Sequence, residues 1–84
     1  MKSIHFSAHA REQCKERGAH EHEVIETITK GSREIVKKGR IICKKNFQHN
    51  AMWNNRYYSI KQVATVIAEE YDTITVITVY TFYF

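Results

Sequence analysis

The stretch from Phe6 to Gly18 reads Phe-Ser-Ala-His-Ala-Arg-Glu-Gln-Cys-Lys-Glu-Arg-Gly, and the rest of the chain is organised around it. The hydroxyl of Ser7 can accept a hydrogen bond from a free amide of a first helical turn. Gly18 tolerates the left-handed backbone with which many helices end. The stretch therefore predicts a short helix over residues 8–17.

Two stripes of side chains run along this predicted helix. The apolar stripe consists of Phe6, Ala10 and Cys14, and the polar stripe consists of His9, Gln13 and Arg17. Histidine is the side chain that exchanges protons near neutral pH, so His9 is the first candidate for acid or base catalysis. The alternative is structural: His9 binds nearby backbone, and Arg17 sits at a helix C-terminus because the macrodipole favours a cation there.

The pattern after Gly18 first continues as helix and then changes period. Residues 20–30 have acidic side chains near their start and Lys30 at their end, and Gly31 follows. This pattern is typical of a helix and predicts a second one here. His20 and Glu23 occupy the two positions of a capping box. From Arg33 onward the period is that of strands.

Residues 34–37 and 40–44 flank a tight turn at Lys38 and Gly39, and this pattern predicts a hairpin. Residues 46–55 have no sustained period and are interpreted as a loop. Residues 57–60 and 62–68 form one bent strand or two short ones. Residues 73–84 are rich in β-branched and aromatic side chains and predict a last strand, with Ile74, Val76, Tyr80, Phe82 and Phe84 on one side.

These elements together predict a single α+β domain over residues 1–84. In this prediction two N-terminal helices pack on one face of an antiparallel sheet of about four strands. Residues 3–6 are either an edge strand or an extended lead-in to the first helix. One face or one end of the sheet should then be free for a partner.

Composition excludes several classes of protein. A hydrophobic content of 43% without proline is far from the range of disordered chains. No apolar run is long enough to span a bilayer, and the N-terminus lacks the apolar region of a signal peptide, so we expect a cytoplasmic protein without a membrane partner.

Cys14 and Cys43 lie in apolar patterns and are expected to be reduced and buried. The histidines and cysteines do not have zinc-site spacing, so we expect no metal or other cofactor.

Positive charge is concentrated in the middle third of the chain. Residues 31–61 carry eight basic side chains against Glu34 alone. Such an excess attracts polyanions, and this indicates nucleic acid as a partner. The candidate RNA-binding residues are Lys37, Lys38, Arg40, Lys44, Lys45, Trp53 and Arg56. The alternative is that the lysines keep an edge hairpin soluble and that Trp53 anchors a loop to the sheet.

Four blocks of the sequence suggest a family. They are Phe6, His9, Ala10, Arg17 and Gly18; then Glu23, Val24 and Gly31; then Gly39 and Arg40; and last Val76-Ile77-Thr78-Val79-Tyr80. In order and spacing these blocks resemble a small prokaryotic family of unknown function related to the BrnT and RelE type toxins. One position departs from the pattern, because Gln13 stands where the family has an arginine four residues after the histidine.

The resemblance implies a RelE/BrnT-like fold and a toxin of a toxin–antitoxin system that acts as a metal-independent endoribonuclease. His9 would be the acid or base, Arg17 and Arg40 would hold phosphate, and Tyr80 would be a second donor. Since His9 and Arg17 are about 12 Å apart along the helix axis, they contact successive phosphates or Arg17 is structural. The implied partners are RNA, an acidic antitoxin and a second copy of the chain.

Two other functions remain open at this stage. One is a non-catalytic module that binds RNA or a protein through the same basic residues. The other is an inactive member of the family that keeps the fold as an interaction scaffold, because Gln13 removes a cation from the polar stripe.

Overall fold

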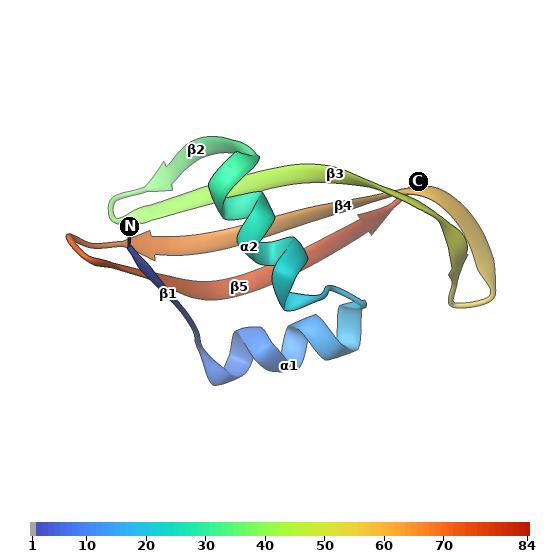
Figure 1. The fold of residues 1–84 in the computed structure, drawn as a ribbon, viewed down its shortest axis with the longest axis horizontal. Coiled ribbons are helices and arrows are strands. Elements are labelled where there is room, and N and C mark those ends of the chain that lie inside the picture. The colour runs from blue at the N-terminus through green and yellow to red at the C-terminus, as the bar shows by residue number, and fades with distance from the viewer. Residues whose placement is uncertain (1) are drawn as a thin grey trace.

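The computed structural model describes residues 2–84. The elements follow in the order β1 (Ser3–Phe6), α1 (Ala8–Arg17), α2 (Glu21–Lys30), β2 (Ser32–Lys37), β3 (Arg40–Trp53), β4 (Arg56–Glu69) and β5 (Thr73–Tyr83). The five strands form one sheet in the order β1-β5-β4-β3-β2. Figure 1 shows α2 crossing one face of the sheet and α1 lying beside β5, with the β3–β4 hairpin extending beyond both helices.

The predicted fold class is wrong in the number, order and direction of the strands. The sheet has five strands rather than four, and it is mixed, because β1 pairs in parallel with β5 while every other pair is antiparallel. The helices are not N-terminal, since β1 precedes them. A strand of four residues is too short to show a period of its own, and its pairing with β5 spans a sequence separation of about seventy residues.

The loop predicted over residues 46–55 is also wrong. Residues 46–53 complete β3, which pairs with β4 as far as Trp53 and Arg56. Asn54 and Asn55 both have positive φ and close the hairpin in a tight turn. This part of the hairpin extends past the helices and has little core to cover, so its sequence carries polar residues where a buried strand carries aliphatic ones.

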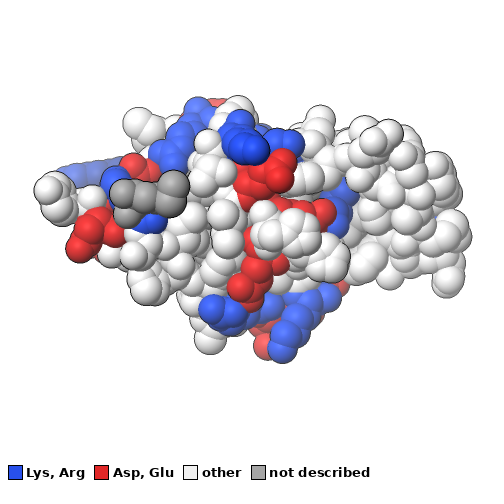
Figure 2. All heavy atoms as spheres, in the orientation of Figure 1, with Lys and Arg blue, Asp and Glu red and all other residues white. Residues whose placement is uncertain are grey.

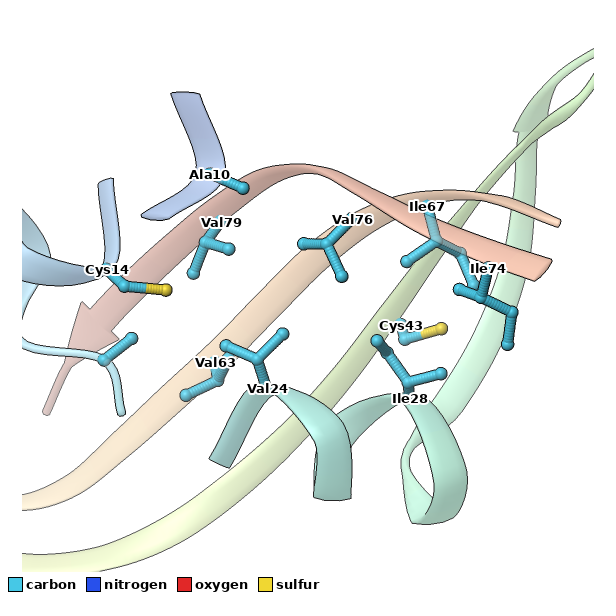
Figure 3. Packing of buried hydrophobic residues seen from close by; sticks show 11 residues of the cluster. Ala10, Cys14, Val24, Ile28, Cys43, Val63, Ile67, Ile74, Val76 and Val79 are labelled. Carbon is cyan, nitrogen blue, oxygen red and sulfur yellow. The ribbon is translucent and has the colours of Figure 1, made fainter. Parts of the chain in front are cut away.

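The core lies between the helices and one face of the sheet (Figure 3). Ala10 and Cys14 come from α1, Val24 and Ile28 come from α2, and the strands contribute Cys43, Val63, Ile67, Ile74, Val76 and Val79. Both cysteines are free and buried, as predicted. Burial raises the pKa of each thiol, which makes the reactive thiolate scarce near neutral pH.

A bulge in β5 changes the predicted facing of its side chains. Ile67 pairs with Val76 but Val66 pairs with Thr78, so one extra residue of β5 is inserted at Ile77. Val76 and Val79 therefore both point into the core and are fully buried, although they are three residues apart. Tyr80 and Phe82 then point to the opposite face from Ile74 and Val76, contrary to the prediction.

A buried ion pair joins the helices to the sheet. Lys61 of β4 is only 5% exposed, and its ammonium group donates to the Glu23 carboxylate at 2.7 Å and to the Gly18 carbonyl at 2.9 Å. Burial by itself raises the pKa of Glu23, but hydrogen bonds from the His20 amide and from Lys61 outweigh burial and hold the pKa below its usual value. The folded protein therefore favours the ionised carboxylate, a stabilisation that is present at neutral pH and lost as the pH falls through the lowered pKa.

Candidate nucleic-acid interface on the open sheet face

The face of the sheet opposite the helices is open. Its side chains form rows across β3, β4 and β5, set by the register of the strands. The rows are Ile42–Val66–Thr78, Lys44–Ala64–Tyr80 and Asn46–Gln62–Phe82, and reciprocal backbone hydrogen bonds add Ile60 and Phe84 beyond them. We call this surface the open face. Tyr80 is 41% exposed, Phe82 47% and Phe84 63%, so no helix covers them.

A hollow lies at the end of the open face that is bounded by β2. It has a volume of about 430 Å³ and is lined by Val36, Lys37, Arg40, Val66, Ile77, Thr78 and Tyr80. Three residues singled out in the sequence therefore meet here: Lys37 and Arg40 as predicted RNA-binding residues, and Tyr80 as a predicted catalytic one. A shallow hollow with two cations and a phenol is suited to an anionic group attached to a flat apolar one.

Some of the basic side chains form ion pairs with acidic side chains, and others do not. Of the eight basic residues in 31–61, three form ion pairs: Arg33 with Glu69, Lys45 with Glu26 and Lys61 with Glu23. Figure 2 shows the helix side, where basic and acidic side chains are interspersed around α2. Within residues 2–84, Lys37, Lys38, Arg40, Lys44 and Arg56 form no ion pair. The first four of these lie together on the β2–β3 hairpin.

Arg17 contacts Tyr80 directly. Its guanidinium carbon lies 5.1 Å from the centroid of the Tyr80 ring, the geometry of a cation–π interaction. The same guanidinium donates to the Val79 carbonyl at 2.5 Å. The Tyr80 ring is thus held next to Arg17 while it lines the hollow that contains Lys37 and Arg40.

The polar stripe of α1 follows the edge of β5. Pairing of β1 with β5 ends at Phe6 and Val76, which leaves the backbone of β5 open beyond that point. The side-chain oxygen of Gln13 accepts from the Val79 amide at 2.8 Å, and Arg17 donates to the carbonyl of the same residue. The Ser7 amide donates to the Val76 carbonyl at 3.1 Å. These groups of α1 replace the missing strand neighbour.

This arrangement explains why residue 13 is a glutamine and not the arginine of the family pattern. Gln13 is 7% exposed and needs an acceptor atom for the Val79 amide. An arginine has only donors and could not accept that hydrogen bond. Gln13 is therefore a structural residue in this chain.

His9 does not line the hollow. It is exposed, and the hydrogen bonds of residues 2–84 include none from its imidazole ring. Helix geometry places it on the polar stripe about 6 Å before Gln13 along the axis, at the Ile77 end of the β5 edge. His9, unlike Arg17, makes no contact with Tyr80 in the structure.

The other predicted RNA-binding residues are distributed over the molecule. Lys44 is exposed on the open face and Lys38 is exposed at the hairpin turn. Lys45 lies on the helix side, paired with Glu26 at 3.0 Å. Trp53 stacks on Tyr83 with ring centroids 5.1 Å apart, and a Cβ on Gly18 would lie 2.6 Å from its ring. Arg40 begins β3 and Trp53 ends it, so Trp53 and Arg56 lie at the opposite end of this strand from Arg40.

Sequence reasoning missed Phe82, Gln62 and Asn46 as members of the open face. For Phe82 the reason is the bulge at Ile77, which reverses the facing of the later residues of β5, and Asn46 lies in the segment predicted to be a loop. No group of three or more histidine, cysteine or acidic side chains within residues 2–84 is placed to hold a metal ion.

The closure of the β5 edge by Gln13 can be tested by substitution. Gln13→Leu keeps the size of the side chain but leaves the buried Val79 amide without a partner, so we expect a loss of about 1–3 kcal/mol in the free energy of unfolding. Glu12→Leu, at an exposed position of the same helix, should change it by no more than about 0.5 kcal/mol. Urea titration measures both, and equal losses in the two variants would contradict the structural role of Gln13.

Comparison with known protein families places the chain in a family of unknown function. Residues 6–81 match a family described as a domain of unknown function, DUF4258. Searches of curated proteins and of solved structures found no match. None of the helices in residues 2–84 has the length and apolar character needed to cross a membrane. Since the match runs from the last residue of β1 into β5 and covers most of the chain, the chain belongs to the DUF4258 family.

Proposed function

We propose that this protein binds RNA on the open face of its sheet and cleaves it without a metal ion. The observation that carries the proposal is the hollow in which Lys37 and Arg40 meet the Tyr80 ring, with Arg17 packed on that ring. The resemblance of its sequence blocks to the BrnT and RelE type toxins also supports ribonuclease activity. A toxin of this kind acts on RNA in the cytoplasm, which is where we propose the protein works.

The charge distribution supports RNA as the ligand. Lys37, Arg40 and Lys44 lie on or beside the open face. The nearest acidic residue in the sheet register is Glu34, which pairs with Ile42. Unpaired cations keep their field available to a ligand, whereas the paired cations on the helix side are largely neutralised by their carboxylates. A polyanion is therefore directed to this end of the open face.

Cleavage by the RNA's own 2′-hydroxyl fits the side chains present. The 2′-oxygen attacks the adjacent phosphorus and the P–O5′ bond breaks, which leaves a 2′,3′-cyclic phosphate and a 5′-hydroxyl. Arg40 and Arg17 would stabilise the charge that develops on the phosphate oxygens, and Tyr80 would orient the group through its hydroxyl. His9, at the β5 edge, would accept the proton of the attacking 2′-hydroxyl and then return a proton to the departing 5′-oxygen.

A non-catalytic RNA-binding protein is the second candidate. Its specific support is that His9 lies outside the hollow while the cations and Tyr80 lie inside it. Binding needs only the groups in the hollow, whereas cleavage needs His9 to reach the same RNA. The two proposals differ in whether His9 matters.

As a toxin, the protein would be neutralised by an acidic antitoxin that covers the same cations. The hairpin residues Lys37, Lys38, Arg40 and Lys44 form the surface that carboxylates of such a partner would meet. A second copy of the chain remains a further proposed partner.

The charge of the hollow should determine affinity and its salt dependence. Replacing Lys37 and Arg40 together with glutamine removes two phosphate contacts, so the slope of log affinity against log salt for single-stranded RNA should become shallower by about 1.4. Lys30→Gln, at the exposed end of α2, is the matched control and should leave the slope unchanged. Fluorescence anisotropy over a salt series measures this, and an unchanged slope in the double variant would place the RNA elsewhere.

Cleavage should depend on His9. His9→Ala should lower the cleavage rate in the presence of EDTA by about two to four orders of magnitude, the usual worth of a general acid or base. Because the ring is exposed and makes no hydrogen bond within residues 2–84, the melting temperature should not change. Inducing the wild-type protein in a bacterial host should arrest growth, and inducing His9→Ala should not. Full cleavage by a folded His9→Ala variant would favour the binding protein over the nuclease.

A further inference from the structure

We infer that the open face is a reader of single-stranded RNA, on which unpaired bases stack against the aromatic side chains of β5. This inference rests on the proposed function and names its substrate class. It also assigns a binding role to Phe82, a residue that has no part in the charge-based binding proposed for the hollow.

The spacing of the aromatic residues is the first argument. Tyr80 and Phe82 occupy alternate positions at the end of β5, Phe84 follows directly after the strand, and all three lie on the same face of the sheet. Alternate residues of a strand are about 6.7 Å apart, which leaves room for one flat base on each ring. Base stacking on aromatic side chains is a general means of holding single strands, because every base has an aromatic face.

The exposure of these rings is the second argument. Phe82 is 47% exposed although it pairs with Gln62 of β4, and Phe84 is 63% exposed although its backbone exchanges two hydrogen bonds with Ile60. Tyr80 pairs with Ala64 of the next strand and is itself 41% exposed. Arg17 packs on that ring at 5.1 Å and fixes its orientation. Rings that are exposed and held in place lose little conformational freedom when a base stacks on them.

The polar groups of the face are the third argument. Gln62 lies beside Phe82 in the sheet, and its amide donates to the side-chain oxygen of Asn46 at 2.9 Å. Both amides retain further donors and acceptors for the edge of an unpaired base. In a double helix these base edges and faces are occupied by pairing and stacking, so this surface matches a single strand.

The cations determine which kind of partner fits the face. An exposed apolar surface alone would suit another protein or a second copy of the chain equally well. Here Lys37, Arg40 and Lys44 lie at the end of the same surface, with Tyr80 lining the hollow that contains the first two. Cations beside exposed aromatic rings complement a chain of phosphates and bases, so the occupant is RNA.

The experiment compares an oligouridylate strand with the duplex that it forms with oligoadenylate. The wild-type protein should bind the single strand more tightly. Phe82→Leu keeps an apolar side chain at this position but removes the ring, and it should weaken binding of the single strand by about 5- to 150-fold, the worth of one stacked base. Phe82→Tyr keeps the ring and should retain the affinity. Tyr71→Ala removes an aromatic residue that is 96% exposed in the β4–β5 turn, and it should have no effect.

Salt dependence separates stacking from charge. Phe82→Leu should weaken binding equally at every salt concentration, whereas the Lys37 and Arg40 double variant should change the slope. Equal affinity for the strand and the duplex, or equal affinity of Phe82→Leu and wild type, overturns this inference but leaves the proposed function intact. Failure of the wild-type protein to bind either RNA overturns both.

Self-association is the remaining outcome. Sedimentation of the wild-type protein and of Phe82→Leu shows whether the face joins two copies. A dimer that Phe82→Leu converts to a monomer, without any change in RNA affinity, would assign the face to the second copy and overturn the inference.

Discussion

The contact between the polar stripe of α1 and the unpaired edge of β5 determines the layout of the molecule. β1 pairs with only the first four residues of β5, and the edge beyond Val76 would otherwise expose backbone groups. Gln13 accepts from the Val79 amide while Arg17 donates to the Val79 carbonyl, so one residue of β5 has both backbone groups satisfied by a helix. The hydroxyl groups of Thr81 and Tyr83 then donate to the carbonyl of Arg17 and fix the end of α1.

Two consequences for the site follow from this contact. Because α1 lies along the edge of β5, it leaves Phe82 and Phe84 exposed on the open face, and Arg17 is its contact with Tyr80 there. Arg17 is held where its guanidinium reaches the Tyr80 ring, so the residue that seals the edge also orients a side chain of the hollow. The ion pair of Lys61 with Glu23 keeps α2 on the other face in the same way. Both helices therefore pack on one side of the sheet, and the other side keeps Lys37, Arg40 and Lys44, which form no ion pair among the described residues, together with the exposed rings of Tyr80, Phe82 and Phe84.

Local chemistry made the helices predictable from the sequence. Ser7 caps α1 by accepting from the Ala10 amide, Gly18 ends it with φ of 73°, and Gly39 supplies the positive φ of the β2–β3 turn. These are effects of neighbours in the chain. The parallel pairing of β1 with β5 is not, since it joins the two ends of the sequence and leaves no mark on either segment alone.

The site was predictable only in part, for the same reason. Charge concentration identified Lys37 and Arg40, and the structure brings them together with Tyr80 in one hollow. The sequence did not reveal that the bulge at Ile77 turns Tyr80 and Phe82 away from the core, because a bulge is set by the partner strand. It also did not show that Lys45 is paired with Glu26 and that Trp53 stacks on Tyr83, since both contacts join different elements. The open face had to be identified from the sheet register.

The central claim is that RNA occupies the face of the sheet opposite the helices. Backbone amide spectra of the isotope-labelled protein, recorded during titration with an oligouridylate strand, test it most directly. The account predicts that amide signals of Lys37 to Lys44 and of Tyr80 to Phe84 shift as RNA is added, while those of Glu21 to Lys30 in α2 stay in place. Shifts confined to α2 and its neighbours would contradict the account, because they would place the RNA on the covered side of the sheet.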